Sequence, residues 1–252
     1  MSAEAMPEGD TLYRIAAGLR PRLIGKRVLT AVPASLAGAS VVTVETKGKH
    51  LLITFADGRV LHTHLGMTGT WHVYRPGERW WKPRHLARAV LEVEDAVAVC
   101  FLAPRVEVRR EQEVPLAHLG PDLLSPDFDL DTVVARARAA EPVTLGELLL
   151  YQRVCAGIGN IWKCESLWRL RLDPWRRVSE TDDLVLRRLY QEARTLMLAS
   201  SKGRRPALAI HGRAGRLCPR CGGRVAARRQ GHPPRVTYFC PNCQTPPTAP
   251  EL

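Results

Sequence analysis

The first run of regularly spaced apolar residues lies near the start of the chain. Leu12, Ile15, Ala16 and Leu19 follow the i, i+3, i+4, i+7 spacing of one helical face. This spacing predicts an amphipathic helix over about 10–23. The Met-Pro-Glu-Gly stretch at 6–9 comes directly before it, so we expect its side chains to lie at the positive end of the helix dipole.

Between about residues 41 and 109 the pattern changes to short runs rich in β-branched and apolar residues. Turn residues separate them, including Asp57-Gly58, a pair that suits a two-residue hairpin loop. Many short strands at close intervals predict a sandwich or barrel. The expected strands cover 41–46, 51–56, 59–65, 70–74, 86–94 and 96–102.

Helical spacing returns in the second half of the chain. Pro115, Pro121 and Pro126 interrupt the pattern first, and we place a domain boundary near residue 128. The expected helices cover 130–140, 145–154, 160–170 and 181–200. The second half is therefore predicted to be a small helical unit followed by a tail that carries cysteines.

Composition bounds the class of protein. The chain has 252 residues, of which 45% are hydrophobic and 25% charged. This balance is typical of a globular protein that folds by itself. No apolar run approaches the roughly 18 residues that would span a bilayer, and the first six residues form no apolar signal region. We expect a cytoplasmic protein, associated with the nucleoid if it is bacterial, without a membrane partner.

The positive charge is concentrated at the C-terminal end. The net charge is +12, and no acidic residue occurs between Glu192 and Glu251. A polyanion is the natural partner of such a segment. A solvated basic surface without a ligand is an alternative, and acidic lipid is less favoured because no amphipathic helix carries the charges. The basic residues are Arg194, Lys202, Arg204, Arg205, Arg213, Arg216, Arg220, Arg224, Arg228, Arg229 and Arg235.

Four of the seven cysteines form two pairs with metal-ligand spacing. Cys218 and Cys221 precede Cys240 and Cys243 by an interval of eighteen residues. Each pair can supply adjacent thiolates to one tetrahedral ion, which predicts a single structural Zn²⁺. Four thiolates leave no open position, so this metal should organise the fold and take no part in catalysis. A protein-binding zinc ribbon is the alternative. The other cysteines, Cys100, Cys155 and Cys164, are expected to be buried and inert.

A glycine-rich turn precedes the helix expected from residue 160. Gly157-Ile-Gly159-Asn160 would bring backbone amides and the Asn160 side chain up to a phosphate at a helix start. Glycines before a helix commonly do no more than cap it, which is the alternative interpretation of this turn.

Several motifs occur together in one order along the chain. They are Pro7-Glu8-Gly9, Gly48-Lys49, His64-Leu-Gly-Met67-Thr-Gly69, the segment from Gln152 to Leu167 with Gly157-Ile-Gly159-Asn160 and Glu165, and the two cysteine pairs. In this order and spacing the chain resembles the formamidopyrimidine-DNA glycosylase/endonuclease VIII family from residue 6 to about 244. Chance would not plausibly place all of them in register.

The resemblance implies an α+β multidomain fold. It would contain an N-terminal β-sandwich with a flanking helix over 6–128, a helix-two-turn-helix domain over 129–205 and a C-terminal zinc hairpin over 206–245, with DNA in the cleft between. The strands and helices expected from periodicity are compatible with this layout. The returning strand of the hairpin is expected over 235–239.

The resemblance also implies catalytic residues. Pro7 would supply an N-terminal secondary amine as nucleophile, and Glu8 would protonate the opening sugar. Lys49 would assist elimination and hold a phosphate, and Arg235 matches the arginine linked to the second, δ elimination. Without the resemblance, Pro7 would be read as a helix-start proline, Lys49 as a turn lysine and Arg235 as a solvated strand residue.

Damaged DNA is the implied partner, and five further residues match positions that contact it. His64 and Asn160 match phosphate contacts, and Met67 matches the wedge that fills the gap left by a flipped nucleotide. Core packing is the alternative for Met67. Arg105 is expected in a loop where the family places further intercalating residues, although the local match is poor, and His118 lies where arginine is often found.

The implied activity is that of a bifunctional glycosylase and abasic-site lyase of base-excision repair, nicking by β,δ-elimination. The glycine of Pro-Glu-Gly and the lack of an arginine-rich Phe-Gly loop near Arg105 resemble the endonuclease VIII side, which favours oxidised pyrimidines over 8-oxoguanine or formamidopyrimidine. Thr11, where many members carry a second glutamate, departs from the pattern. A noncatalytic lesion-binding member and a zinc-ribbon transcription or RNA factor remain alternatives. A monomer without a small-molecule cofactor is expected.

The residues before Pro7 conflict with this chemistry. A proline inside a chain is a tertiary amide and has no free amine. Three explanations are open: Met6 is the true initiator, the leading residues are trimmed, or the protein binds DNA without lyase activity. We favour the first, because methionine before proline is readily removed from a nascent chain.

Overall fold

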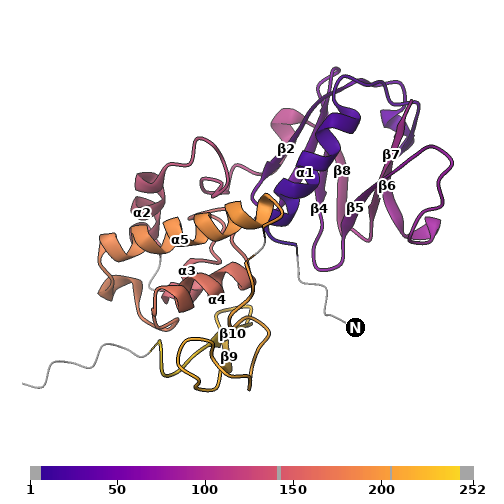
Figure 1. Cartoon of the computed structure of the whole chain (residues 1–252). Coiled ribbons are helices and arrows are strands. Elements are labelled where there is room, and N and C mark those ends of the chain that lie inside the picture. The colour runs from indigo at the N-terminus through magenta and orange to yellow at the C-terminus, as the bar shows by residue number, and fades with distance from the viewer. Residues whose placement is uncertain (1–6, 141–142, 205, 245–252) are drawn as a thin grey trace, which may run out of the picture. The chain divides into compact units, whose positions relative to one another are not determined.

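The computed structural model describes residues 7–140, 143–204 and 206–244. The chain divides into two compact units, Met1–Ala117 and His118–Leu252 (Figure 1). The division falls earlier than the position near 128 that the prolines suggested. The residues before Pro7, on which the question of a free amine depends, lie outside the described part. Among the described residues no helix is long and apolar enough to cross a membrane.

The first unit is a sandwich of two antiparallel sheets, each of four strands. One sheet has the order β1-β6-β7-β5 and the other β2-β3-β4-β8. Its elements are α1 (Gly9–Leu23), β1 (Thr30–Val32), β2 (Val41–Lys47), β3 (His50–Phe55), β4 (Arg59–His64), β5 (Thr70–Tyr74), β6 (Ala87–Val93), β7 (Ala96–Phe101) and β8 (Arg105–Arg110).

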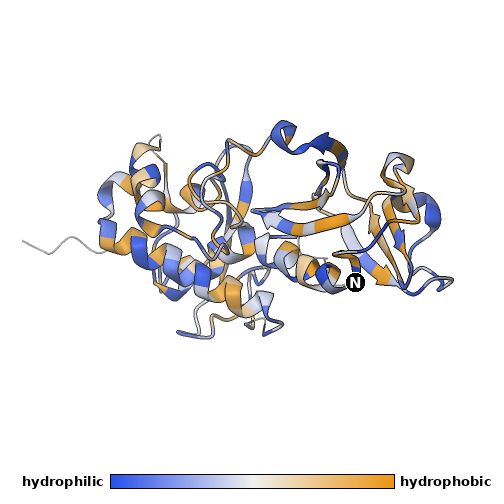
Figure 2. Cartoon of the chain, turned by 90° about the horizontal axis from the view of Figure 1, so that it is seen from above, coloured by the Kyte–Doolittle hydropathy of each residue, from blue (hydrophilic) through white to orange (hydrophobic). Residues whose placement is uncertain are grey.

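The core of this unit lies between the sheets because alternate strand residues point inward. In β3, Leu51, Ile53 and Phe55 are buried, whereas the residues between them are partly exposed. The apolar face of α1, including Leu12 and Leu19, completes the same core. Figure 2 shows the apolar and polar positions alternating along these elements. The predicted N-terminal helix and the six predicted strands are confirmed.

Two strands that periodicity did not predict, β1 and β8, lie at sheet edges. The sequence of β8 is Arg-Val-Glu-Val-Arg-Arg, in which only Val106 and Val108 pack against the core. Edge strands commonly carry charges, which discourage pairing with another chain. Those charges conceal the strand pattern in the sequence. Arg105 consequently begins a strand, and the expectation that it lies in a loop is wrong.

The second unit contains four α-helices and a two-stranded hairpin among its described residues. The large side chains of Trp162 and Tyr190 are fully buried in it. The helices are α2 (Leu130–Ala139), α3 (Leu145–Leu148), α4 (Asn160–Arg169) and α5 (Asp183–Ser201), and the hairpin pairs β9 (Ala226–Gln230) with β10 (Arg235–Phe239). The predicted helices 130–140, 160–170 and 181–200 and the returning strand 235–239 are confirmed.

The helix predicted over 145–154 is wrong in length, since α3 ends at Leu148. The chain beyond it pairs with an earlier segment instead. The Ala156 N–H donates to the Pro121 carbonyl at 2.9 Å, and the Leu123 N–H donates to the Ala156 carbonyl at 3.0 Å. These bonds form an isolated parallel bridge and require extended backbone at Ala156, so the helix cannot continue toward it.

A buried polar chain connects α4 to the hairpin. The Lys163 ammonium, fully buried, donates to the Thr237 hydroxyl at 2.7 Å. Thr237 donates in turn to the Gln230 side chain at 2.7 Å, and the Gln230 amide donates to the Pro174 carbonyl at 2.8 Å. Buried polar groups need such partners, because an unpaired one costs the desolvation energy. The network therefore fixes the hairpin on the helical unit.

Candidate functional site

Pro7 and Glu8 stand at the beginning of α1. Pro7 is half-buried, and Glu8 is 1% exposed. Glu8 is the N-cap residue, and its carbonyl accepts from the Thr11 and Leu12 N–H groups at 3.0 and 3.2 Å. Its side chain does not cap the helix. An acidic side chain at the positive end of a helix is thus held in a nearly water-free position beside a proline.

Lys49 lies in the tight turn between β2 and β3. The turn consists of Gly48 and Lys49, since β2 ends at Lys47 and β3 begins at His50. Gly48 has φ of +60°, the conformation that a two-residue hairpin loop requires at its first position. The Lys49 side chain is half-buried. A glycine is therefore needed here to present the lysine at the tip of the hairpin.

Strand register brings Lys49, His64 and Arg105 to the same end of one sheet. His50, next to Lys49, pairs with His64 at the end of β4, and His64 pairs with Arg105 at the start of β8. Figure 1 shows the start of α1 at this end of the sandwich as well. Three residues expected to act on DNA or its lesion are thus carried by the same end of the first unit as Glu8.

His64 is held neutral with a defined tautomer. Burial lowers its pKa, and the positive charges of Lys49 and Arg105 lower it further. The Gly66 N–H donates to His64 Nδ1 at 3.2 Å, so this nitrogen is the acceptor and the proton resides on Nε2. A neutral imidazole with an Nε2–H group can donate to an anionic oxygen without carrying a charge itself.

Met67 lies in the turn between β4 and β5. Its side chain is 59% exposed, so it does not pack in the core, which was the alternative explanation for it. The turn is closed by a bond from the Gly69 N–H to the Leu65 carbonyl at 2.8 Å. A Cβ on Gly69 would lie 2.4 Å from that carbonyl oxygen, so glycine is required for the turn to form. The turn presents an apolar side chain to solvent on a rigid support.

Two further histidines, which no sequence motif singled out, lie on the same sheet face as His64. His62 is fully buried, and its Nε2 is 2.8 Å from Nδ1 of His50. The His50 ring is 4.8 Å from that of His64. His62 Nδ1 lies 4.0 Å from a Glu107 carboxylate oxygen. Their signal in the sequence was that residues 50, 62 and 64 each stand next to a core leucine, Leu51, Leu61 or Leu65, on paired strands.

Burial lowers the pKa of His62 to about 4, against the opposing influence of Glu107. Between pH 6.5 and 4 the unfolded chain therefore binds a proton that the folded chain refuses, and stability falls as the pH falls. From pH 7 to pH 5 this loss amounts to about 2 kcal/mol. Urea unfolding at the two pH values should show a smaller loss for His62→Leu than for the unmodified protein. Equal losses in both proteins would contradict the assignment.

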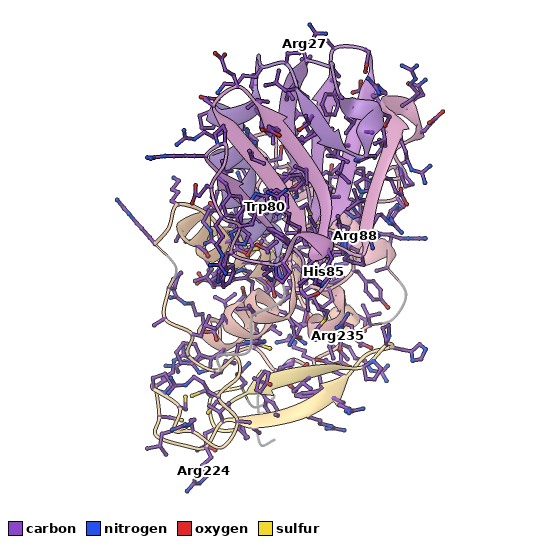
Figure 3. All side chains as sticks on the ribbon, turned by 90° about the vertical axis from the view of Figure 1, so that its right-hand side faces the viewer. Arg27, Trp80, His85, Arg88, Arg224 and Arg235 are labelled. Carbon is purple, nitrogen blue, oxygen red and sulfur yellow. The ribbon has the colours of Figure 1, made fainter. Side chains whose placement is uncertain are left out.

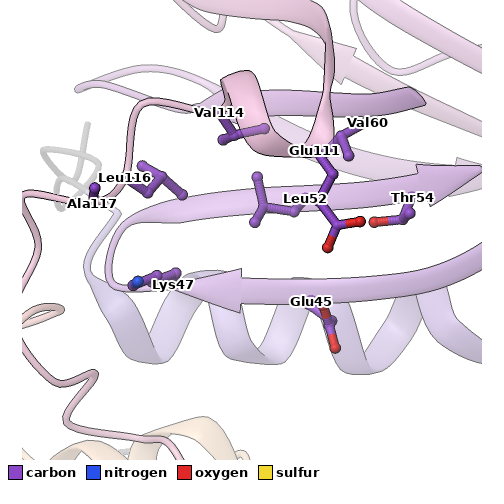
Figure 4. A pocket seen from close by; sticks show the side chains of 9 residues that line it. All are labelled: Glu45, Lys47, Leu52, Thr54, Val60, Glu111, Val114, Leu116 and Ala117. Carbon is purple, nitrogen blue, oxygen red and sulfur yellow. The ribbon is translucent and has the colours of Figure 1, made fainter. Parts of the chain in front are cut away.

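The outer face of this sheet also carries a pocket of about 220 Å³. Leu52, Thr54 and Val60 form its floor, and the segment from Glu111 to Ala117 covers it (Figure 4). Its lining is mixed apolar and polar, without a group that the sequence assigned to chemistry. The pocket is a consequence of the segment crossing the sheet at this point.

In the second unit, Gln152 organises the turn before α4. Its amide donates to the carbonyls of Leu150 and Ile158, each at 3.0 Å, and its oxygen accepts from the Gly157 N–H at 3.0 Å. Gly157 has φ of +109°, a conformation open to glycine alone. This bonding delivers Asn160 to the first turn of the helix.

The Asn160 side chain links the helix start to the hairpin. Its amide nitrogen donates to the Val236 carbonyl at 2.8 Å and lies 3.4 Å from His211 Nε2. Its oxygen is buried and has no protein partner among the described residues. The Asn160 amide is therefore partly engaged within the protein, and its role in holding β10 was not evident from the sequence.

Glu165 fastens the segment that leads to the cysteines. Its carboxylate accepts from the backbone N–H groups of Ala209, Ile210 and His211 at 2.9, 3.0 and 2.8 Å. Its side chain is nearly fully buried. Charge-assisted bonds of this kind are about twice as strong as neutral ones. Glu165, the glutamate that follows the glycine turn in the motif, thus holds the backbone of residues 209–211 in place.

The four paired cysteines converge on one point. Their sulfur atoms all lie within 4.8 Å of one another, with Cys218 and Cys243 at 3.9 Å and Cys221 and Cys240 at 3.5 Å. Tetrahedral thiolates around a zinc ion would be about 3.8 Å apart. The cluster therefore fits a metal ion with four sulfur ligands. Cys100, Cys155 and Cys164 are buried as predicted, and Cys164 packs in the same apolar cluster as Cys218 and Cys240 without belonging to the group of four.

The hairpin beside this cluster carries exposed cations. Arg228 and Arg229 on β9 and Arg235 at the start of β10 are all exposed, and Arg235 pairs with Gln230 across the hairpin. Figure 3 shows Arg235 on its strand and Arg224 near the cysteines. His118, at the start of this unit, is exposed as well. The positive charge expected of the C-terminal quarter is thus exposed on the two-stranded hairpin.

Comparison with known proteins gives consistent matches. Residues 6–109 match the model of the formamidopyrimidine-DNA glycosylase N-terminal domain, and residues 119–205 match that of the formamidopyrimidine-DNA glycosylase H2TH domain. A probable endonuclease 8 2 of Streptomyces coelicolor is 40% identical to this chain, over 96% of the length of this chain and 95% of the length of the relative. The DNA-(apurinic or apyrimidinic site) lyase Nei2 of Mycolicibacterium smegmatis is 38% identical over 95% of this chain and 99% of its own.

Solved structures agree with the fold. The MutM (Fpg) protein of Thermus thermophilus aligns with a TM-score of 0.79 and 29% identity over 94% of this chain and 98% of its own. The Lactococcus lactis formamidopyrimidine-DNA glycosylase, bound to DNA containing an abasic site, aligns with a TM-score of 0.82 and 20% identity. The alignment covers 95% of this chain and 100% of the Lactococcus lactis chain. From both domain models and from full-length relatives of up to 40% identity, the chain belongs to the formamidopyrimidine-DNA glycosylase/endonuclease VIII family.

Proposed function

We propose that the protein is a bifunctional DNA glycosylase and abasic-site lyase of base-excision repair that removes oxidised pyrimidines. The observation that carries the proposal is the grouping of a proline, a water-shielded glutamate and a turn lysine with a neutral histidine in the sandwich unit. Relatives named endonuclease 8 and abasic-site lyase, similar over nearly the whole chain, support it.

Pro7, as a free secondary amine, would add to the anomeric carbon of the damaged nucleotide. The base would leave with the electrons of the glycosidic bond, and the resulting iminium would join enzyme to sugar. Glu8 would protonate the sugar oxygen as the ring opens, a task for which a shielded carboxylic acid is suited. Lys49 would assist removal of the sugar proton in β elimination, and Arg235 would support the second, δ elimination.

The remaining residues would hold the flipped nucleotide. His64 would donate from Nε2 to a phosphate oxygen, the Asn160 amide would donate to another with the hydrogen now turned toward His211, and exposed Met67 would fill the gap in the base stack. Arg105 and His118 are proposed as further DNA-binding residues. Zn²⁺ is proposed for the four-cysteine cluster, where it would keep the basic hairpin folded and contribute no reacting group.

A cleavage panel tests the proposal and the lesion class. Duplexes that contain dihydrouracil, 8-oxoguanine or a preformed abasic site would be incubated with the protein and resolved on denaturing gels. We expect dihydrouracil and abasic duplexes to be nicked with phosphate at both ends of the gap, because both eliminations occur. Faster cutting at 8-oxoguanine would assign a purine preference instead. Binding without a nick in any duplex would identify a noncatalytic lesion-binding protein.

A further inference from the structure

A ledge of aromatic and basic residues lies on the outer face of the other sheet of the sandwich. It is formed by the segment 75–86 between β5 and β6, which contains Trp80 and Trp81, together with Arg88 near the start of β6. Figure 3 views the molecule toward this sheet and labels Trp80, His85 and Arg88. The proposed chemistry of lesion removal uses none of these residues.

The ledge is anchored through Trp80. Its ring stacks on Tyr74 with centroids 6.1 Å apart and meets Phe101 edge to face at 5.9 Å. These residues belong to a small apolar cluster on the outer sheet face, separate from the main core. Leu86 ties the end of the segment to the sheet, because its carbonyl accepts from the Leu102 N–H at 3.0 Å. The segment is therefore a fixed surface feature.

Trp81 is presented outward from this anchor. Its backbone N–H donates to the Tyr74 hydroxyl at 3.2 Å, and its ring meets His72 at 5.3 Å, yet 69% of the residue remains exposed. Keeping an indole in water forgoes the stabilisation that its burial would give. A large aromatic side chain that is rigidly supported and still exposed indicates a contact surface.

The positive charges around Trp81 indicate an anionic partner. The ledge holds five Lys and Arg residues, four in the segment between the strands and Arg88 in β6, against the single acid Glu78; the four are Arg75, Arg79, Lys82 and Arg84. The Lys82 ammonium lies 5.4 Å from the Trp81 ring centroid, and the Arg84 guanidinium lies 4.6 Å from that of Trp80. Cations interleaved with an exposed aromatic ring are the combination that binds single-stranded nucleic acid, the ring stacking a base and the cations meeting phosphates.

Arg88 extends the cationic side of the ledge. It lies in a register irregularity of β6, where pairing with β7 shifts between Ala87 and Ala89. A bulge leaves one residue out of the ladder and redirects its side chain. Arg88 is exposed at this point, beside a ledge whose other cations lie in the preceding loop.

We propose that this ledge is a second DNA-binding site, specific for single-stranded DNA. An unpaired base would stack on Trp81, and Lys82 and Arg84 would bind the flanking phosphates. Duplex bases are already stacked on their neighbours and cannot occupy it. The site would therefore recognise unpaired bases and not duplex DNA. The inference does not rest on the proposed lyase activity.

Fluorescence anisotropy with a labelled oligothymidylate of about 15 nucleotides and with an undamaged duplex of the same length tests the site. Trp81→Ala should weaken single-strand binding about tenfold, because stacking of one base is lost. Duplex binding should change less than twofold. Lys82→Ala should weaken single-strand binding and lower the salt dependence by about one counterion.

The pair Trp81→Phe and Trp81→Leu separates stacking from plain apolar contact. Phenylalanine keeps an aromatic face and should retain most of the single-strand affinity, whereas leucine should behave like alanine. The proposal is overturned if all three variants bind oligothymidylate as the unmodified protein does, if leucine serves as well as phenylalanine, or if duplex and single-strand affinity fall together. Failure of lesion cleavage would leave this outcome unaffected, since the probes contain no lesion.

Discussion

Borohydride is expected to trap the protein covalently on abasic-site DNA when its chain begins at Pro7, and to trap essentially none when residues 1–6 remain attached. A free proline nitrogen is a secondary amine that can form an iminium with the sugar aldehyde, which the hydride reduces to a stable bond. In the extended chain the same nitrogen is an amide and has no nucleophilic electron pair. The adduct yield should fall on the order of a thousandfold or more.

The comparison needs proteins of known N-terminus, so both forms would be verified by intact mass before trapping. Selective acetylation of the N-terminal nitrogen in the form that begins at Pro7 provides the matched control, because it blocks that amine without adding a peptide or modifying a lysine. It should remove the adduct as fully as the extension does. Efficient trapping of protein that demonstrably retains residues 1–6 would refute Pro7 as the nucleophile and would indicate a lysine amine instead.

Loss of the metal is expected to disable DNA binding while leaving the sandwich folded. Structural zinc sites contribute on the order of 10 kcal/mol to the folding of the segment they hold. Without the ion, the four sulfur atoms, which lie within 4.8 Å of one another, would no longer be joined through a metal. The hairpin with Arg228, Arg229 and Arg235 would then lose its support. The affinity for duplex DNA should fall about a hundredfold, since several phosphate contacts depend on that ribbon.

The double variant Cys240→Ala, Cys243→Ala tests this, with Cys100→Ala as control. Cys240 and Cys100 are both fully buried, but Cys100 lies in the sandwich core and outside the cluster. Metal content by mass spectrometry should drop from one zinc per chain to none in the double variant alone, in parallel with the loss of anisotropy signal. A double variant that still binds one zinc and DNA normally would show that the cluster is not the metal site.

Much of the secondary structure followed from local spacing. The helix at the N-terminus and strand β5 have bounds within a residue of those predicted, because the helix has one apolar face and the strand is a short apolar and aromatic run bounded by turns. Helix α3 was predicted too long, since the pairing of Ala156 with residues near Pro121 stops it and that contact is remote in sequence. Strands β1 and β8 were missed for a related reason, as their edge positions depend on neighbours that the local pattern does not reveal.

The sequence by itself determined the two cysteine pairs, whose short spacing predicts a metal site, and the glycine turns beside Lys49 and Asn160, whereas the roles expected of Pro7, Glu8 and Lys49 came only from the family resemblance. Residues a few positions apart cannot separate far, whatever the fold. Only the tertiary structure decided which distant residues meet. Strand register set His62 against His50 and near Glu107, and packing of Trp80 on Tyr74 and Phe101 left Trp81 in water. These contacts arise because a shared core selects one register among many, and no local pattern encodes that choice.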